Sequence, residues 1–116
     1  MQIVKEEKLG QCLILYLDGE LLGGEQSQRL QDRIYEAIRQ GDAGVVLDMS
    51  RVGWMNSSGL GVLMGCMTSL RSGNGDLKLV GVSDRVKRPI QITRLDQVLS
   101  MHDTVKAAVQ SFEEGG

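Results

Sequence analysis

The chain has 116 residues, of which 41% are hydrophobic and 24% are charged, and its formal net charge is -2. This length suits a single domain with its own core, and the charge balance argues against general nucleic-acid binding, which needs a basic surface. The longest apolar runs are far shorter than the roughly 20 residues of a membrane-spanning helix. A charged stretch at residues 5–8 stands where a signal peptide would be apolar, which favours a cytoplasmic protein.

Two strands are expected first. Residues 3–8 are predicted to form a half-exposed strand, and the apolar run 12–17 suits a strand that is covered on both faces. A connector over 20–24 leads to a surface helix over 25–40, whose apolar residues form one stripe. The apolar run 45–49 predicts the next strand.

The most informative segment follows a loop after that strand. Apolar residues recur at helical spacing from Leu60 to Leu70, and three residue types that cap helices well precede them, Asn56, Ser57 and Ser58. Hydroxyl groups at a helix N-terminus, after a strand and a loop, form a suitable place for a phosphate group.

The last third of the chain continues the alternation of strands and helices. Residues 77–82 predict a strand, and 85–94 a short helix that Pro89 should kink or restart. A brief edge strand is expected within 95–101.

A last helix, capped by Asp103, and a frayed tail at 113–116 complete the prediction. Strand and helix alternate after an initial hairpin. This pattern predicts an α/β fold, a single domain over 1–116, with a mixed and mostly parallel sheet of four to five strands and about four helices.

Two enzymatic interpretations of the central segment are disfavoured. A serine nucleophile needs a base, but the only histidine is His102, and no glycine stands two residues before Ser57 or Ser58. A dinucleotide site needs its glycines directly after the strand. Gly61 and Gly65, one helical turn apart, are instead expected to let the helix approach the sheet or a partner closely.

Other side chains suggest packing or protein contacts. Cys12 and Cys66 have no ligand-spaced partner and are predicted to be buried, reduced thiols. Trp54 lies just before the serines, where an exposed indole would suit a protein-binding surface. A basic cluster follows later in the chain: Arg85, Lys87, Arg88 and Arg94. The cluster fits either a solvated helix face or a surface for an acidic partner.

Residues 47–63, Leu-Asp-Met-Ser-Arg-Val-Gly-Trp-Met-Asn-Ser-Ser-Gly-Leu-Gly-Val-Leu, resemble the signature of STAS domains of the anti-sigma factor antagonist family. That signature is a strand ending in Asp-x-Ser, then an apolar-Met-Asp-Ser-Ser/Thr-Gly-Leu-Gly turn into a helix. Residues 19–21 resemble the family's Gly-Glu-Leu-Asp loop, and 86–88 its Val-Lys-Arg helix. The similarity spans nearly the whole chain in order and spacing.

The resemblance implies a regulatory binding module of bacterial signalling rather than a catalyst. Ser57 matches the family's phosphoacceptor, which an anti-sigma factor with serine kinase activity phosphorylates and a metal-dependent serine phosphatase restores. The unphosphorylated form then binds the anti-sigma factor and releases a sigma factor. The positions implied to contact the partner are Glu20, Leu21, Leu22, Trp54, Met55, Asn56, Ser58, Gly59, Leu60 and Gly61.

Two residues depart from the family pattern. Asn56 stands where an aspartate is usual, and Leu22 replaces the aspartate that ends the Gly-Glu-Leu-Asp loop. Either change also fits a STAS domain that is never phosphorylated and serves as a scaffolding subunit of a lipid- or anion-transport system. No cofactor or metal is expected, and the oligomeric state is left open.

Overall fold

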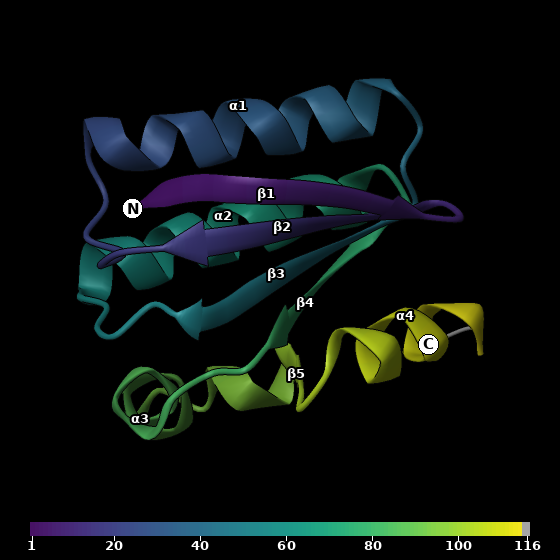
Figure 1. Ribbon diagram of the computed structural model, residues 1–116. Helices are drawn as coiled ribbons and strands as arrows, with labels where there is room; N and C mark the ends of the chain where they lie inside the picture. The colour runs from purple at the N-terminus through teal and green to yellow at the C-terminus, as the bar shows by residue number, and fades with distance from the viewer. Residues whose placement is uncertain (115–116) are drawn as a thin grey trace.

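Five strands form one sheet in the order β1-β2-β3-β4-β5 in the computed structural model, which describes residues 1–114 (Figure 1). The elements are β1 (Gln2–Leu9), β2 (Cys12–Asp18), α1 (Glu25–Arg39), β3 (Gly44–Arg51), α2 (Ser57–Ser72), β4 (Asp76–Val80), α3 (Asp84–Ile92), the 3-10 helix η1 (Leu95–Gln97), β5 (Ser100–His102) and α4 (Val105–Glu113). Only β1 and β2 pair antiparallel, and the other neighbours are parallel. The predicted α/β fold class is therefore confirmed.

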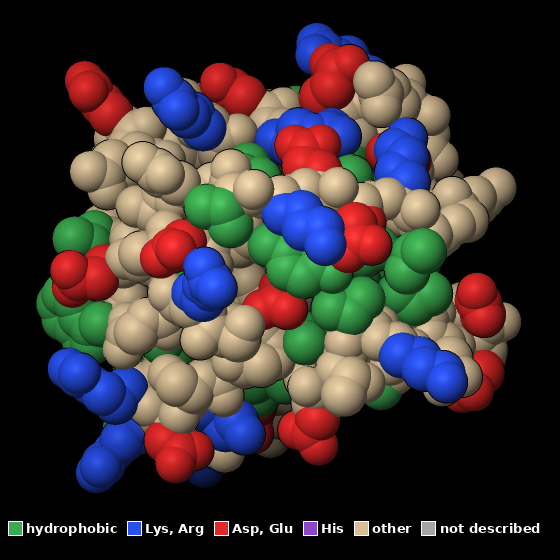
Figure 2. Space-filling view, viewed as in Figure 1, with side chains coloured by type: hydrophobic (Ala, Val, Ile, Leu, Met, Phe, Trp, Pro, Cys, Tyr) green, Lys and Arg blue, Asp and Glu red, His purple; other side chains and the backbone are tan. Residues whose placement is uncertain are grey.

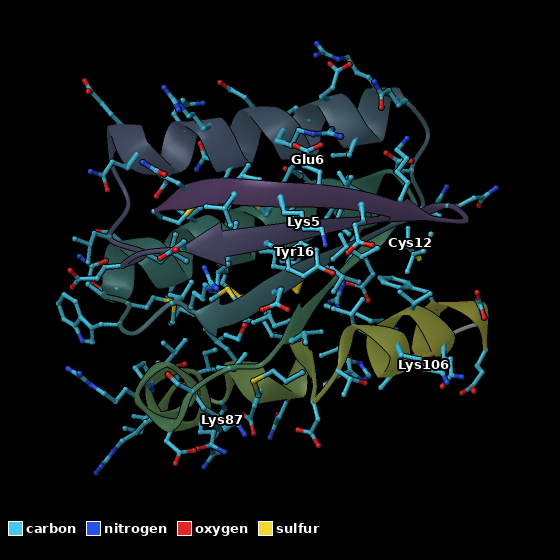
Figure 3. All side chains as sticks on the ribbon, in the orientation of Figure 1. Lys5, Glu6, Cys12, Tyr16, Lys87 and Lys106 are labelled. Atoms are coloured by element: carbon cyan, nitrogen blue, oxygen red, sulfur yellow. The ribbon has the colours of Figure 1, made fainter. Side chains whose placement is uncertain are left out.

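The two faces of the sheet are covered unequally. Helices α1 and α2 lie together on one face, α4 lies on the other, and α3 stands beyond the carboxyl ends of the strands (Figure 1). Strand β2 alternates accordingly: Leu13 and Leu15 enter the large core under α1 and α2, whereas Ile14 joins a smaller cluster under α4. The face of β1 and β2 away from α1 carries Lys5, whose ammonium lies 5.2 Å from the centre of the Tyr16 ring (Figure 3).

Two helix details differ from the sequence prediction. Pro89 does not restart α3, which is one continuous helix through that residue. The carbonyl of Arg85, which loses its helical partner, belongs to an exposed residue that water reaches. Asp103 does not cap α4. The cap is Thr104, whose hydroxyl accepts a hydrogen bond from the Ala107 N–H at 3.0 Å.

Two strand boundaries and the tail also differ. The strand predicted over 77–82 ends at Val80, because Gly81 has a φ of +68°, which extended backbone does not allow. The brief edge strand exists but occupies only 100–102, after η1. Glu113 of the predicted frayed tail is the last residue of α4, and residues 115–116 lie outside the described part of the chain.

A buried lysine holds α4 to the sheet. Lys78 on β4 is 3% exposed, donates a hydrogen bond to the Ser111 hydroxyl, and lies 4.1 Å from the centre of the Phe112 ring. The Nε2 atom of His102, on the neighbouring strand β5, lies 2.8 Å from the Ser100 hydroxyl. Burial and the nearby Lys78 ammonium lower the pKa of His102 below its usual value.

This lowered pKa predicts a loss of stability in acid. In the unfolded chain His102 titrates near its usual value of about 6.5. The unfolded state therefore binds more protons just below that pH, and the free energy of unfolding falls as the pH falls, by at most about 1.4 kcal/mol per pH unit for one proton. Urea unfolding from pH 7 to pH 5 should show a steeper loss for the wild type than for His102→Gln. Equal slopes would contradict the assignment.

Candidate functional site

The serine turn, residues 54–58 between β3 and the first turn of α2, lies at the carboxyl ends of the parallel strands, at the left of Figure 1. Two loops meet there, the loop from β2 to α1 and the loop from β3 to α2. The Leu21 N–H donates to the Trp54 carbonyl at 3.0 Å, and the Asn56 N–H donates to the Leu21 carbonyl at 3.3 Å. Leu21 and Met55 form an isolated parallel bridge, and both are buried. The two loops are therefore fixed to each other by backbone hydrogen bonds and core packing.

Asn56 is the N-cap of α2. Its Oδ1 atom accepts a hydrogen bond from the Gly59 N–H at 2.8 Å, and its backbone carbonyl accepts from Leu60 at 3.0 Å. Ser57 and Ser58 are exposed, and within residues 1–114 their backbone N–H groups have no hydrogen-bond partner. Two free donors and the positive end of the helix dipole thus accompany the two hydroxyls.

Two glycines let the loops cross at this helix end. A Cβ on Gly59 would lie 2.0 Å from the carbonyl oxygen of Leu21, and a Cβ on Gly23 would lie 2.8 Å from the Cβ of Ser58. Gly61 and Gly65 have open space where a side chain would begin. The expectation that they bring the helix close to the sheet is therefore wrong, and only approach of a partner remains open for them.

The predicted partner-contact positions divide into two groups. Leu21, Met55, Gly59 and Leu60 are buried in the domain. In the free domain these four residues pack in the core and fix the loops, and direct contact with a partner stays a prediction for them. Asn56 is half-buried. The exposed group comprises Glu20, Leu22, Trp54, Ser58 and Gly61, and the predicted phosphoacceptor Ser57 is exposed as well.

The structure adds Arg85 to this end of the molecule. A hollow of about 450 Å³ is lined by Glu20, Gly53, Trp54 and Arg85, so the first turn of α3 borders the loop before the serines. Sequence reasoning placed Arg85 only in a basic cluster. The contact depends on how the chain turns after β4, and no local pattern encodes it.

Other chemistry lies away from the serines. His102 is on β5, next to Ser100 and Ser111, and not beside Ser57. In residues 1–114 no three His, Cys, Asp or Glu side chains are grouped so that they could hold a metal ion. Cys12 and Cys66 are buried and free, as predicted, and burial raises the pKa of the Cys66 thiol to about 11. None of the described helices combines the length and apolar character needed to cross a membrane.

Comparison with known proteins points to one family. The family described as STAS domain matches residues 3–108 of the chain. An anti-sigma-B factor antagonist of Listeria monocytogenes is 36% identical over 84 residues, which is 69% of this chain and 74% of that protein.

Two solved structures share the fold. The crystal structure of protein TM1081 from Thermotoga maritima superposes with a TM-score of 0.83 at 24% identity, over 92% of both chains. The Bacillus cell fate determinant SpoIIAA, in its phosphorylated form, superposes with a TM-score of 0.73 at 25% identity, over 93% of this chain and 97% of that chain.

The crossing of the two loops predicts opposite effects of alanine at two glycines of α2. Gly59→Ala should destabilise the domain by about 1–3 kcal/mol, because the new methyl group meets the Leu21 carbonyl. Gly61→Ala should stabilise it by about 0.5–1 kcal/mol, because alanine favours helix and the space is open. Urea unfolding of both variants measures the change in the free energy of unfolding. Equal changes in the two variants would argue that the β2–α1 loop does not restrict the side chain at position 59.

Proposed function

Because this chain belongs to the STAS domain family, we propose that it is an anti-sigma factor antagonist that binds an anti-sigma factor when Ser57 is unphosphorylated and so releases a sigma factor. The partner is an anti-sigma factor with serine kinase activity, and a metal-dependent serine phosphatase restores the free hydroxyl. The name of the Listeria relative and the phosphorylated form of SpoIIAA support this function. The protein acts by binding, in the cytoplasm, and the chemistry belongs to its partners.

The observation that carries the proposal is the exposed hydroxyl of Ser57 on the first residue of α2. A kinase can reach it, and a phosphate there meets free N–H groups and the helix dipole. Ser58 is the second exposed hydroxyl, and its Cβ lies close to the backbone of Gly23 in the β2–α1 loop, whereas Ser57 stands one residue nearer the end of the helix. This asymmetry favours Ser57 as the acceptor.

A phosphate on Ser57 acts on the partner rather than on the fold. It adds about -1.5 to -2 charges at a helix N-terminus, where a negative charge stabilises the folded state by about 0.3–1 kcal/mol. The partner, in contrast, must desolvate that charge against a surface that includes Trp54, 41% exposed, and Leu22, 38% exposed. A penalty of several kcal/mol is enough to abolish a micromolar interaction.

A scaffolding STAS subunit of a lipid- or anion-transport system is the second candidate. The observation that favours it is Asn56, which caps α2 as an aspartate would but leaves the serine turn without a carboxylate. A turn without that charge presents a different surface to a kinase.

Variants of Ser57 test the switch. Ser57→Ala should bind the anti-sigma factor constitutively. Ser57→Asp and the phosphorylated protein should bind at least about tenfold more weakly, for the desolvation reason given above, at a nearly unchanged melting temperature. Calorimetric titration measures the binding, and intact mass with peptide mapping locates the phosphate.

Ser58→Ala is the matched control. It should still be phosphorylated on Ser57 and should then dissociate from the anti-sigma factor. Full affinity of the phosphorylated protein, or phosphate on Ser58, would refute the assignment. Absence of phosphorylation together with binding to a membrane transport protein would favour the scaffolding function.

Restoring the carboxylate at position 56 gives a second test. Asn56→Asp should keep the fold, because aspartate can accept the same hydrogen bond from Gly59 and a carboxylate suits a helix N-terminus. It should change the rate of Ser57 phosphorylation more than the affinity for the partner. Initial rates with the cognate kinase measure the effect, and equal rates for both proteins would show that the charge at position 56 is irrelevant to the kinase.

A further inference from the structure

Helix α3 presents an outward stripe that the serine turn does not include. Arg85, Arg88 and Ile92 are exposed, and their spacing of three and four residues places them side by side along one face. The opposite face holds Val86 and Ile90, both buried in the core. Ile92 is 71% exposed, an unusual position for isoleucine on a helix that already buries an apolar face.

The stripe is continuous with the serine turn through the tryptophan. Arg85 and Trp54 line the same hollow of about 450 Å³, at the end of the molecule that carries Ser57. Figure 2 shows hydrophobic side chains at the left edge, with a group of Lys and Arg side chains directly below them where Figure 1 places α3. The indole of Trp54 therefore borders the end of the stripe that carries Arg85. Tryptophan and arginine are the residue types that contribute most to protein interfaces.

The basic residues in and just after α3 form no ion pairs within residues 1–114. Four of the 13 lysine and arginine residues of an acidic chain lie within residues 85–94. Ion pairs join other basic residues to carboxylates, but in the described part of the chain none involves Arg85, Lys87, Arg88 or Arg94. Glu20 borders the hollow but forms no ion pair with Arg85 there.

We propose that Trp54, Arg85, Arg88 and Ile92 form a second contact surface for the anti-sigma factor. This surface binds an acidic and partly apolar face of that partner. This inference rests on the proposed function and adds a part of the interface beyond the serine turn. The tryptophan and isoleucine supply apolar area, and the two arginines pair with carboxylates of the partner.

A protein partner fits this surface better than a nucleic acid does. Nucleic-acid binding needs a basic field over an extended surface, whereas the chain as a whole is acidic. Only two of the four basic residues lie on the stripe, and Lys87 instead lines a separate hollow together with Gln91 and His102. A short basic stripe flanked by an indole and an isoleucine matches an acidic protein surface with apolar neighbours.

Charge reversal on the stripe tests the proposal. We titrate the purified cognate anti-sigma factor into wild-type protein, the double variant Arg85→Glu, Arg88→Glu, and Ile92→Ser. The double variant and Ile92→Ser should each lower affinity about tenfold or more. The double variant should also reduce the dependence of affinity on salt, because attraction between charges is what salt screens. Urea unfolding checks that each variant stays folded.

Lys106→Glu is the matched control, because Lys106 is exposed on α4, away from α3 (Figure 3). If the wild type binds and the double variant weakens no more than Lys106→Glu, the stripe is not part of the interface and the proposed function stands. If the wild type does not bind the anti-sigma factor, the proposed function fails and the inference fails with it. Competition by a short DNA duplex or by phosphatidylglycerol vesicles, lost in the double variant, would also overturn the inference.

The single tryptophan supplies a readout that does not depend on charge. Protein labelled with 5-fluorotryptophan has one ¹⁹F resonance, from Trp54, which should shift on binding. The shift should persist in Lys106→Glu. Trp54→Phe has no tryptophan and therefore no signal, so its binding is measured by titration and should be weaker than that of the wild type. An unshifted resonance at saturation would exclude Trp54 from the interface and overturn the proposal.

Discussion

The contact between Gly59 and the Leu21 carbonyl is the constraint on which the serine turn depends. With only a hydrogen atom at position 59, the β2–α1 loop can lie across the first turn of α2. That approach allows the backbone of Leu21 to bond with both Trp54 and Asn56, and it brings Leu21 and Met55 into the core. The exposed hydroxyl of Ser57 is therefore held by buried neighbours, although it lies at the end of a loop.

The sequence predicted the fold class and the helix N-terminus at the serines, because both follow from local patterns. Strand β2 and helix α2 were evident from runs and periodicity of apolar residues, and Ser57 stood at a helix start. The roles within the motif were less accessible. Leu21 and Met55 resembled contact residues but are buried, and Arg85 was not linked to Trp54. Burial and contact between distant segments depend on tertiary packing, which local patterns do not record.

Asn56 shows that one position can serve a structural role and an electrostatic role separately. Capping needs only an oxygen acceptor, and the amide supplies it to the Gly59 N–H as a carboxylate would. The charge that an aspartate would add is not needed for the fold. A substitution here can therefore change the charge beside Ser57 without a matching change in stability.

In the proposed switch, a phosphate on Ser57 acts from a fixed position. A group added to Ser57 projects from a helix end that is firmly positioned, so the partner cannot avoid it by displacing the loop. Attraction by Arg85 and Arg88 would bring the partner to the end of the molecule that carries Ser57, whether or not Ser57 is phosphorylated. The serine turn alone would then determine whether the partner stays bound. Recruitment and release would be assigned to different elements, α3 and α2, and each could change without loss of the other.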